Sequence, residues 1–160
     1  MSTAEIIRTL RTDRTNTQSE IAALIGCSRV SYIDYEYGRK LLPLRGVMIL
    51  ADYYSVSSDF ILGLSLKENP YPSLKEAAGK SFANICEEYP VNRIIKDIRC
   101  RRDLTQRQVA DCIGCTQAGY SGYESGRRSI PVDVIVQLSG FYKVSTDYLL
   151  GLTYSTAIAE

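Results

Sequence analysis

The sequence contains one unit of about 60 residues twice, at an offset of 88 positions. The stretch TQSEIAALIGCSRVSYIDYEYGRK at residues 17–40 returns as TQRQVADCIGCTQAGYSGYESGRR at residues 105–128. The register holds without a gap from Ile6, aligned with Ile94, to Ser65, aligned with Thr153, and more than a third of the aligned pairs are identical. Self-similarity over this length is typical of a duplicated domain. We therefore predict two copies of one small domain.

The repeat sets the expected domain organisation. We predict a first domain over residues 1–65, a linker over 66–91, a second domain over 92–153 and a tail over 154–160. A chain of 160 residues with 45% hydrophobic content can build two cores of roughly 60 residues each, near the lower limit for independent folding. Within the linker, a capping-box pattern followed by apolar residues on one face predicts an amphipathic helix over residues 73–88.

Both copies have the sequence signals of five short helices. Apolar residues recur at helical spacing, and no strand-like alternation competes with them. The residues expected to cap, start or end helices are Thr17, Ser28, Gly38, Pro43, Ser57 and Gly63 in the first copy, and Thr105, Thr116, Gly126, Pro131, Ser145 or Thr146, and Gly151 in the second. The pattern predicts an all-α fold of two five-helix domains.

The cysteine pattern argues against a disulfide framework and against a zinc site. Five cysteines are an odd number, and their context favours reduced thiols. Cys112 and Cys115 form a C-x-x-C, but the chain has no histidine and no second C-x-x-C to complete four zinc ligands. We therefore expect no metal, and we expect Cys112 and Cys115 to be small core residues that flank the turn.

No pattern for catalysis or membrane insertion stands out. The carboxylates are scattered, histidine is absent, and no glycine-rich phosphate loop follows a strand, so we expect neither an enzyme nor a cofactor. No apolar run approaches the roughly 18 residues of a membrane helix, and the N-terminal residues do not resemble a signal peptide. The expected location is the cytoplasm, with no membrane partner.

Three motifs in each copy point to a known family. They are LRTDRTNTQSEIAALIGCS, YEYGRK and VSSDFILGL in the first copy, and IRCRRDLTQRQVADCIGCT, YESGRR and VSTDYLLGL in the second. Each copy thereby resembles the lambda-repressor-like helix-turn-helix domain of the Cro and phage-repressor regulators, also called the xenobiotic-response-element family. The resemblance covers about 120 of the 160 residues. It implies a sequence-specific regulator of transcription, in the first place a repressor, that binds double-stranded DNA with its third helix in the major groove.

The resemblance also implies which side chains support the third helix and which meet DNA. Arg11 is expected to pair with Glu36, and Arg99 with Glu124, between the first and third helices of each copy. The residues implied at the DNA are Gln18, Ser28, Arg29, Val30, Ile33, Arg39 and Lys40 in the first copy, and Gln106, Arg107, Thr116, Gln117, Ala118, Ser121, Arg127 and Arg128 in the second. Arg101 and Arg102 are expected near the same edge. Arginine suits guanine and glutamine suits adenine at the major-groove edge of a base pair.

The two copies differ in the residues that they would present to DNA. Val30 and Ile33 give the first copy an apolar outward face, and Asp34 and Gly122 stand where a polar or basic residue is common in the family. Residues 1–65 contain 7 basic and 7 acidic side chains, whereas residues 92–160 contain 9 and 7. We therefore expect the second copy to bind DNA better, and the operator to be asymmetric or pseudo-palindromic.

A second class of function stays open at this stage. The net charge of +1 is not typical of a strong nonspecific DNA binder, whose affinity comes mainly from neutralised phosphates. The same fold could serve as a protein-interaction module, such as an anti-repressor or antitoxin-like partner, that docks through Val30 and Ile33. The sequence also leaves open whether the chain forms a homodimer. DNA binding that weakens with salt would favour a regulator, and salt-insensitive capture of a protein would favour the alternative.

Overall fold

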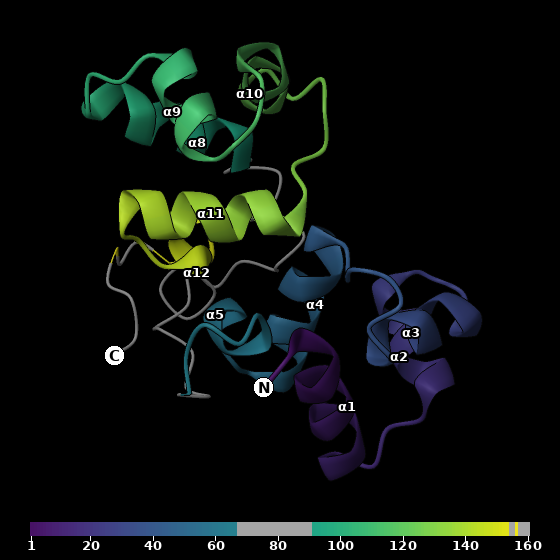
Figure 1. Cartoon of the computed structure of the whole chain (residues 1–160). Helices are drawn as coiled ribbons and strands as arrows, with labels where there is room; N and C mark the ends of the chain where they lie inside the picture. The colour runs from purple at the N-terminus through teal and green to yellow at the C-terminus, as the bar shows by residue number, and fades with distance from the viewer. Residues whose placement is uncertain (67–90, 154–155, 157–160) are drawn as a thin grey trace. The chain divides into compact units, whose positions relative to one another are not determined.

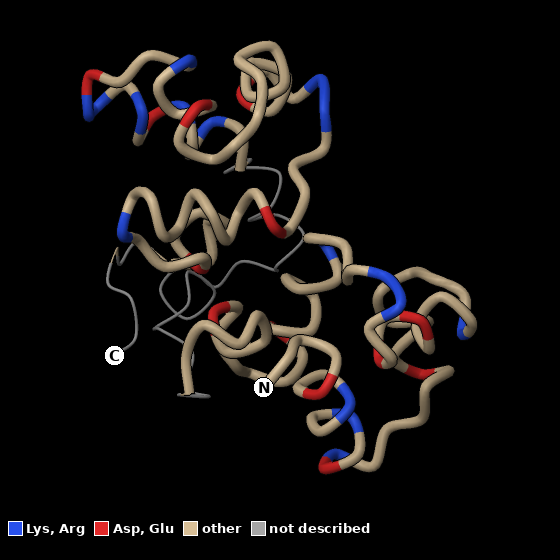
Figure 2. Tube along the Cα trace, viewed as in Figure 1, with Lys and Arg blue, Asp and Glu red and all other residues tan. Residues whose placement is uncertain are grey.

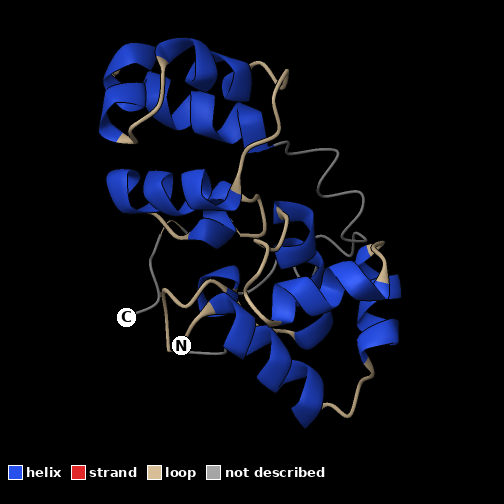
Figure 3. Cartoon of the chain, turned by 45° about the vertical axis from the view of Figure 1, so that its right-hand side comes forward, coloured by secondary structure: helices blue, strands red, loops and turns tan. Residues whose placement is uncertain are grey.

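The computed structural model of the chain describes residues 1–66, 91–153 and Thr156. The chain divides into two compact units, one with helices α1 to α5 and the other with helices α8 to α12 (Figure 1). All the regular elements in these described ranges are α-helices (Figure 3), which confirms the predicted all-α class. The predicted linker helix over residues 73–88 lies outside the described residues, as does Cys86.

Each unit contains the five helices that its sequence signals predict. The first unit consists of α1 (Thr3–Asp13), α2 (Gln18–Ile25), α3 (Arg29–Glu36), α4 (Leu44–Tyr54) and α5 (Ser58–Ile61). The second unit consists of α8 (Val91–Arg101), α9 (Gln106–Cys112), α10 (Gln117–Glu124), α11 (Val132–Tyr142) and α12 (Thr146–Leu149). The helices of the two units begin and end at nearly the same aligned positions.

Local hydrogen bonds explain where the helices begin. The Thr17 hydroxyl accepts from the Glu20 amide while the Glu20 carboxylate accepts from the Thr17 amide, and Thr105 and Gln108 repeat this capping box at the start of α9. Such a cap typically stabilises a helix by about 1 kcal/mol. Serine or threonine also caps α3, α10, α5 and α12, at Ser28, Thr116, Ser57 and Ser145.

The apolar faces of the five helices form the core of each unit. In the first unit the fully buried side chains include Ile7, Ile21, Tyr32, Leu50, Tyr54 and Ile61. In the second they include Ile95, Tyr120, Ile135, Leu138, Tyr142 and Leu149. Burial of a side chain of this size stabilises the fold by roughly 1.5–3 kcal/mol. The third helix of each unit is therefore anchored through one tyrosine whose ring is completely enclosed.

The prediction that Cys112 and Cys115 are core residues is wrong for Cys112. Cys100 and Cys112 are exposed, while Cys27 and Cys115 are partly buried. The helical phase explains the error for α9. Its buried side chains are Val109 and Ala110, followed by Ile113, and Cys112 lies about 110° around the helix from the middle of that arc, at 100° per residue.

Among the described helices, none has both the length and the apolarity that a membrane crossing requires.

Candidate nucleic-acid interface

The second and third helices of each unit form a tight helix–turn–helix. A glycine follows the second helix with a positive φ, 74° at Gly26 and 67° at Gly114, a conformation that glycine adopts without steric cost. The next amide then donates back to the second helix, from Cys27 to the Ala22 carbonyl and from Cys115 to the Ala110 carbonyl, at 2.9 Å in both units. Ala22 and Ala110 are buried, so the second helix presents a small side chain at this point.

An ion pair joins the first helix of each unit to the end of the third. In the second unit, Arg99 Nε donates to Glu124 Oε1 at 2.6 Å and Arg99 Nη2 to Glu124 Oε2 at 3.0 Å. The remaining guanidinium nitrogen donates to the Leu104 carbonyl at 2.7 Å. Arg11 and Glu36 make the same pair in the first unit, with Nε 2.5 Å from Oε1. The structure therefore brings together the residues that the family resemblance pairs.

A glutamine of the second helix completes this buried cluster. Gln106 Nε2 donates to Glu124 Oε2 at 2.8 Å, and Gln18 Nε2 to Glu36 Oε2 at 2.9 Å. Burial alone would raise the pKa of each glutamate, but the hydrogen bonds from the arginine and the glutamine outweigh it and hold each pKa below its ordinary value of 4.5. Both carboxylates are therefore ionised at neutral pH, and each links three helices.

In the second unit the hydrogen-bonded chain continues to the start of the third helix. Gln117 Nε2 donates to Gln106 Oε1 at 3.2 Å, so Arg99, Glu124, Gln106 and Gln117 form one connected chain. In the first unit Arg29 occupies the position of Gln117, and the hydrogen-bonded chain ends at Gln18. Sequence analysis placed both glutamines at the interface but did not predict that they bind each other.

The structure places most of the predicted DNA-binding side chains at the surface. The exposed ones are Ser28, Arg29, Val30, Arg39 and Lys40 in the first unit, and Arg107, Thr116, Gln117, Ala118, Arg127 and Arg128 in the second. Gln18 and Ile33, like Gln106 and Ser121, are only partly exposed. Val30 is 70% exposed.

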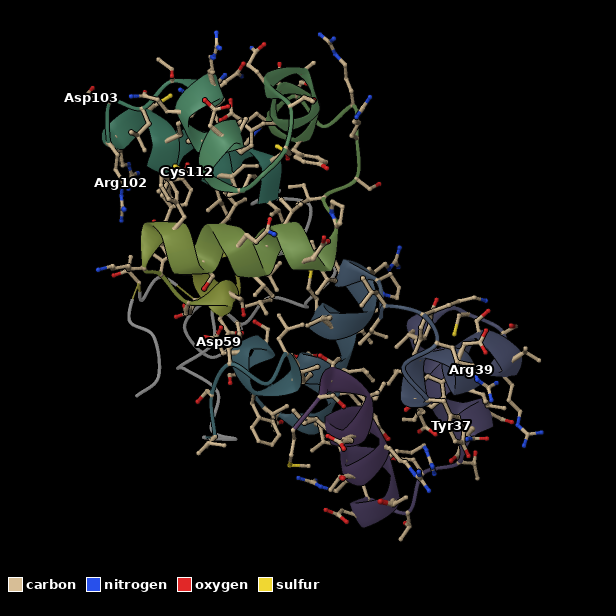
Figure 4. The ribbon with its side chains drawn as sticks, in the orientation of Figure 1. Tyr37, Arg39, Asp59, Arg102, Asp103 and Cys112 are labelled. Atoms are coloured by element: carbon tan, nitrogen blue, oxygen red, sulfur yellow. The ribbon has the colours of Figure 1, made fainter. Side chains whose placement is uncertain are left out.

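The loop after the third helix contains two basic residues in each unit, Arg39 and Lys40 in the first and Arg127 and Arg128 in the second. The contacts of this basic loop differ between the units. Lys40 Nζ lies 2.8 Å from Asp34 Oδ2, and Arg39 Nη1 lies 3.7 Å from Asp34 Oδ1. The guanidinium groups of Arg39 and Arg8 also lie over the Tyr37 ring, at 5.4 and 5.8 Å from its centroid. Arg39 and Tyr37 are labelled in Figure 4. Sequence analysis missed these contacts, although an acidic residue five and six positions before two cations is a visible signal.

The corresponding loop of the second unit has no such carboxylate. Gly122 occupies the position of Asp34, and the Arg128 side chain lies against it, so that a Cβ at Gly122 would meet Arg128 Cδ at 3.0 Å. Within the described residues, no carboxylate pairs with Arg127 or Arg128. Figure 2 shows the two basic residues in the loop that follows α10.

One of the two arginines expected near the DNA edge, Arg102, makes a contact within its own unit. Arg102 Nη2 donates to the Tyr142 carbonyl at 2.6 Å, and its guanidinium lies 5.2 Å from the centroid of the Tyr142 ring. Figure 4 shows the side chain directed toward α11. Arg102 therefore fixes the end of α11 to α8.

The fold and the buried cluster define both units as helix-turn-helix domains. The profile of the helix-turn-helix family matches residues 7–61 and 95–149, which together make up more than half of the chain. The chain belongs to this family, and it contains the family's domain twice.

Several curated proteins that the chain resembles are named as bacterial or phage regulators. It is 41% identical over 59 residues to the uncharacterized HTH-type transcriptional regulator YobD of Bacillus subtilis (strain 168), a match that covers 37% of this chain and 53% of the relative. It is 37% identical over 57 residues to the HTH-type transcriptional regulator ImmR of the same organism, covering 36% of this chain and 45% of the relative.

A third relative is named as a repressor. The match to the cryptic phage CTXphi transcriptional repressor RstR of Vibrio cholerae is 40% identical over 50 residues, and covers 31% of this chain and 45% of the relative. The chain thus spans about half the length of the curated relatives that it matches. No solved structure matches the chain significantly.

Proposed function

We propose that the chain is a cytoplasmic, sequence-specific DNA-binding regulator of transcription that acts as a repressor. In this proposal α3 and α10 enter the major groove of double-stranded DNA, and the relatives named as transcriptional regulators support the class. The observation on which the proposal rests is the hydrogen-bonded chain from Arg99 to Gln117.

The hydrogen-bonded chain holds the exposed side-chain amide of Gln117 at the start of α10. A glutamine amide both donates and accepts, and it can bind adenine N6 and N7 together at the major-groove edge. Because Gln117 is already held by Gln106, which is held in turn by Glu124, less side-chain entropy is lost when it binds a base.

The first unit offers a different side chain at the same position. Arg29 is exposed at the start of α3, where it suits guanine O6 and N7. Two units with different residues at this position cannot prefer the same half-site. We therefore propose an asymmetric or pseudo-palindromic operator, with one half-site for each unit. A homodimer on a longer site is compatible with the same chemistry.

Selection of binding sites from a random double-stranded DNA library tests this function. We expect a recovered site with an adenine-dependent half and a guanine-dependent half. On that site, Gln117→Ala should relax the preference at the first half and Arg29→Ala at the second, each at a cost of about 1–3 kcal/mol.

The controls for this experiment come from the same surface. Arg128→Ala should weaken binding to every sequence and flatten the salt dependence, since it changes a phosphate contact and not a base contact. Equal enrichment of all library sequences, or base preferences that neither variant changes, would contradict sequence-specific recognition by α3 and α10.

The exposed Val30 favours a second candidate function. An apolar side chain that is 70% exposed on the outer face of α3 cannot hydrogen-bond a base edge or a phosphate, and it suits a protein-interaction module. In that case Val30→Ser should abolish capture of the partner protein, and added salt should have little effect on it. Binding of DNA with a strong salt dependence would instead favour the regulator.

A further inference from the structure

The two basic loops differ in one residue that decides what their cations bind. In the first unit the Asp34 carboxylate accepts from Lys40 Nζ at 2.8 Å and also pairs with Arg39. The Asp34 side chain is 17% exposed, whereas those of Arg39 and Lys40 are 67% and 59% exposed. The cations thus lie at the surface with a carboxylate fixed beneath them.

The backbone of this loop has the same local hydrogen bond in both units. The Lys40 amide donates to the Asp34 carbonyl at 3.3 Å, and the Arg128 amide donates to the Gly122 carbonyl at 3.1 Å. The two cations therefore leave the backbone at equivalent places. What differs is the side chain below them, a carboxylate in the first unit and a hydrogen atom in the second.

Arg128 uses the space that Gly122 leaves. Its side chain crosses α10 so closely that a Cβ at Gly122 would meet its Cγ at 3.1 Å and its Cδ at 3.0 Å, and its Nη1 lies 4.0 Å from the Cβ that Gly119 lacks. The guanidinium is therefore placed near the start of α10, without a described carboxylate to neutralise it.

We propose that Asp34 is an internal competitor for DNA phosphate, which holds Lys40 and Arg39 and so makes the first unit the weaker phosphate-binding half of the protein. The proposal rests on the DNA-binding function proposed above and assigns to Asp34 a role in dividing the sequence-independent affinity between the two units. A cation already paired with a carboxylate gains less from a phosphate, because it must give up the first partner to bind the second. The second unit then supplies most of the sequence-independent affinity.

The salt dependence of DNA binding tests this directly in the full chain. The slope of log K against log salt concentration changes by about 0.9 for each DNA phosphate that the protein neutralises. With a random-sequence duplex as the probe, Asp34→Asn should steepen the slope by roughly 1 to 2 and raise the affinity about 3- to 10-fold near 0.1 M salt. The substitution keeps the size of the side chain and removes only its charge.

Two controls separate release of the cations from simple loss of a negative charge. Asp13→Asn removes an exposed carboxylate of the same unit that has no described cationic partner, and it should leave the slope nearly unchanged. Asp34→Asn in a chain that also bears Arg39→Gln and Lys40→Gln should produce no increase in affinity, since no cation is then left to release.

The reciprocal change in the second unit gives an independent measurement. Gly122→Asp places a carboxylate beside Arg128 and should flatten the slope by about 1, while Gly122→Asn adds the same bulk without charge and should flatten it less. This pair keeps the proposal testable if Asp34→Asn does not fold, which circular dichroism would show.

Failure of the inference and failure of the proposed function give different results. If the unsubstituted protein binds duplex DNA with a slope that Arg128→Gln flattens, but neither Asp34→Asn nor Gly122→Asp changes it, the role of Asp34 is refuted and DNA binding stands. If the unsubstituted protein shows no salt-dependent binding of duplex DNA, the proposed function is refuted, and the inference is refuted with it.

Discussion

Asn16 and Leu104 occupy equivalent positions in the two units but interact differently. Asn16 Nδ2 donates to the hydroxyl of Tyr53 at 3.0 Å, while Asn16 Oδ1 is buried with no hydrogen-bond partner in the described part of the chain. The second unit has Leu104 and Phe141 at these two positions. A buried acceptor without a partner costs roughly 1–3 kcal/mol. The first unit therefore contains a local defect that the second lacks.

Transfer of the apolar pair into the first unit should stabilise it. We expect Asn16→Leu together with Tyr53→Phe to raise the free energy of unfolding by about 1 kcal/mol, because both partners of the hydrogen bond are replaced at once. Denaturant unfolding of the full chain, followed by circular dichroism, measures the change. The reverse pair, Leu104→Asn with Phe141→Tyr, should destabilise the second unit. A loss of stability in the first variant would show that the hydrogen bond to Tyr53 is worth more than the unpaired oxygen costs.

At the level of helices, the buried glutamate joins three elements of each unit. Glu124 lies at the end of α10 and binds Arg99 of α8 and Gln106 of α9. The pKa of Glu124 is lowered in the folded state, so the ion pair stabilises the fold fully above pH 4.5, the ordinary glutamate value, and this stabilisation is lost as the pH falls through the folded pKa. The packing of the third helix should therefore weaken in acid.

Glu124→Gln tests this link between charge and packing. Near neutral pH we expect it to lower the free energy of unfolding by roughly 3 kcal/mol, because it leaves the largely buried Arg99 without its counter-ion. The difference from the unsubstituted protein should shrink as the pH falls below 4.5 and through the lowered pKa of the folded state, where Glu124 itself becomes neutral. Glu36→Gln is the matched variant in the first unit. An equal difference at pH 3 and pH 7 would mean that packing, and not charge, explains the loss.

At the level of the whole molecule, one chain contains the helix-turn-helix domain twice, and the proposed function assigns one half-site to each copy. Covalent linkage makes the second binding event intramolecular, which raises the overall affinity without any new contact. Half-sites for paired helix-turn-helix domains lie about one helical turn, or roughly 10 base pairs, apart. If both units bind one operator at the same time, the affinity must depend on the distance between its two half-sites.

Changing the spacing of a selected operator tests simultaneous engagement. Insertion of about 5 base pairs between the halves turns one of them to the opposite face of the duplex and should lower the affinity by roughly 10-fold or more, to that of a single half-site. Titrations on the original and the lengthened duplex measure this loss. As a control, mutation of either half-site in the lengthened duplex measures the affinity of the single half-site that remains. Equal affinities at both spacings would show that the two units do not bind one operator together.

The sequence by itself determined the helices and the fold of each unit. The caps at Thr17 and Thr105 and the glycines at Gly26 and Gly114 act through hydrogen bonds and backbone angles within a few residues, so a sequence pattern is enough to predict them. The duplication strengthens these predictions, because each signal occurs twice in the sequence, 88 positions apart. The helical phase of α3 likewise places Tyr32 on its buried face.

Only the tertiary structure decided which of the candidate side chains are free and which are held. Gln117 meets Gln106 because two helices cross at the turn, and Lys40 meets Asp34 because the loop folds back over α3. Arg102 is bound to Tyr142, 40 residues away. Such interactions depend on how helices and loops are placed in three dimensions, and spacing along the chain does not encode that placement. The sequence therefore predicts a candidate DNA-binding surface, and the folded structure distinguishes its two halves.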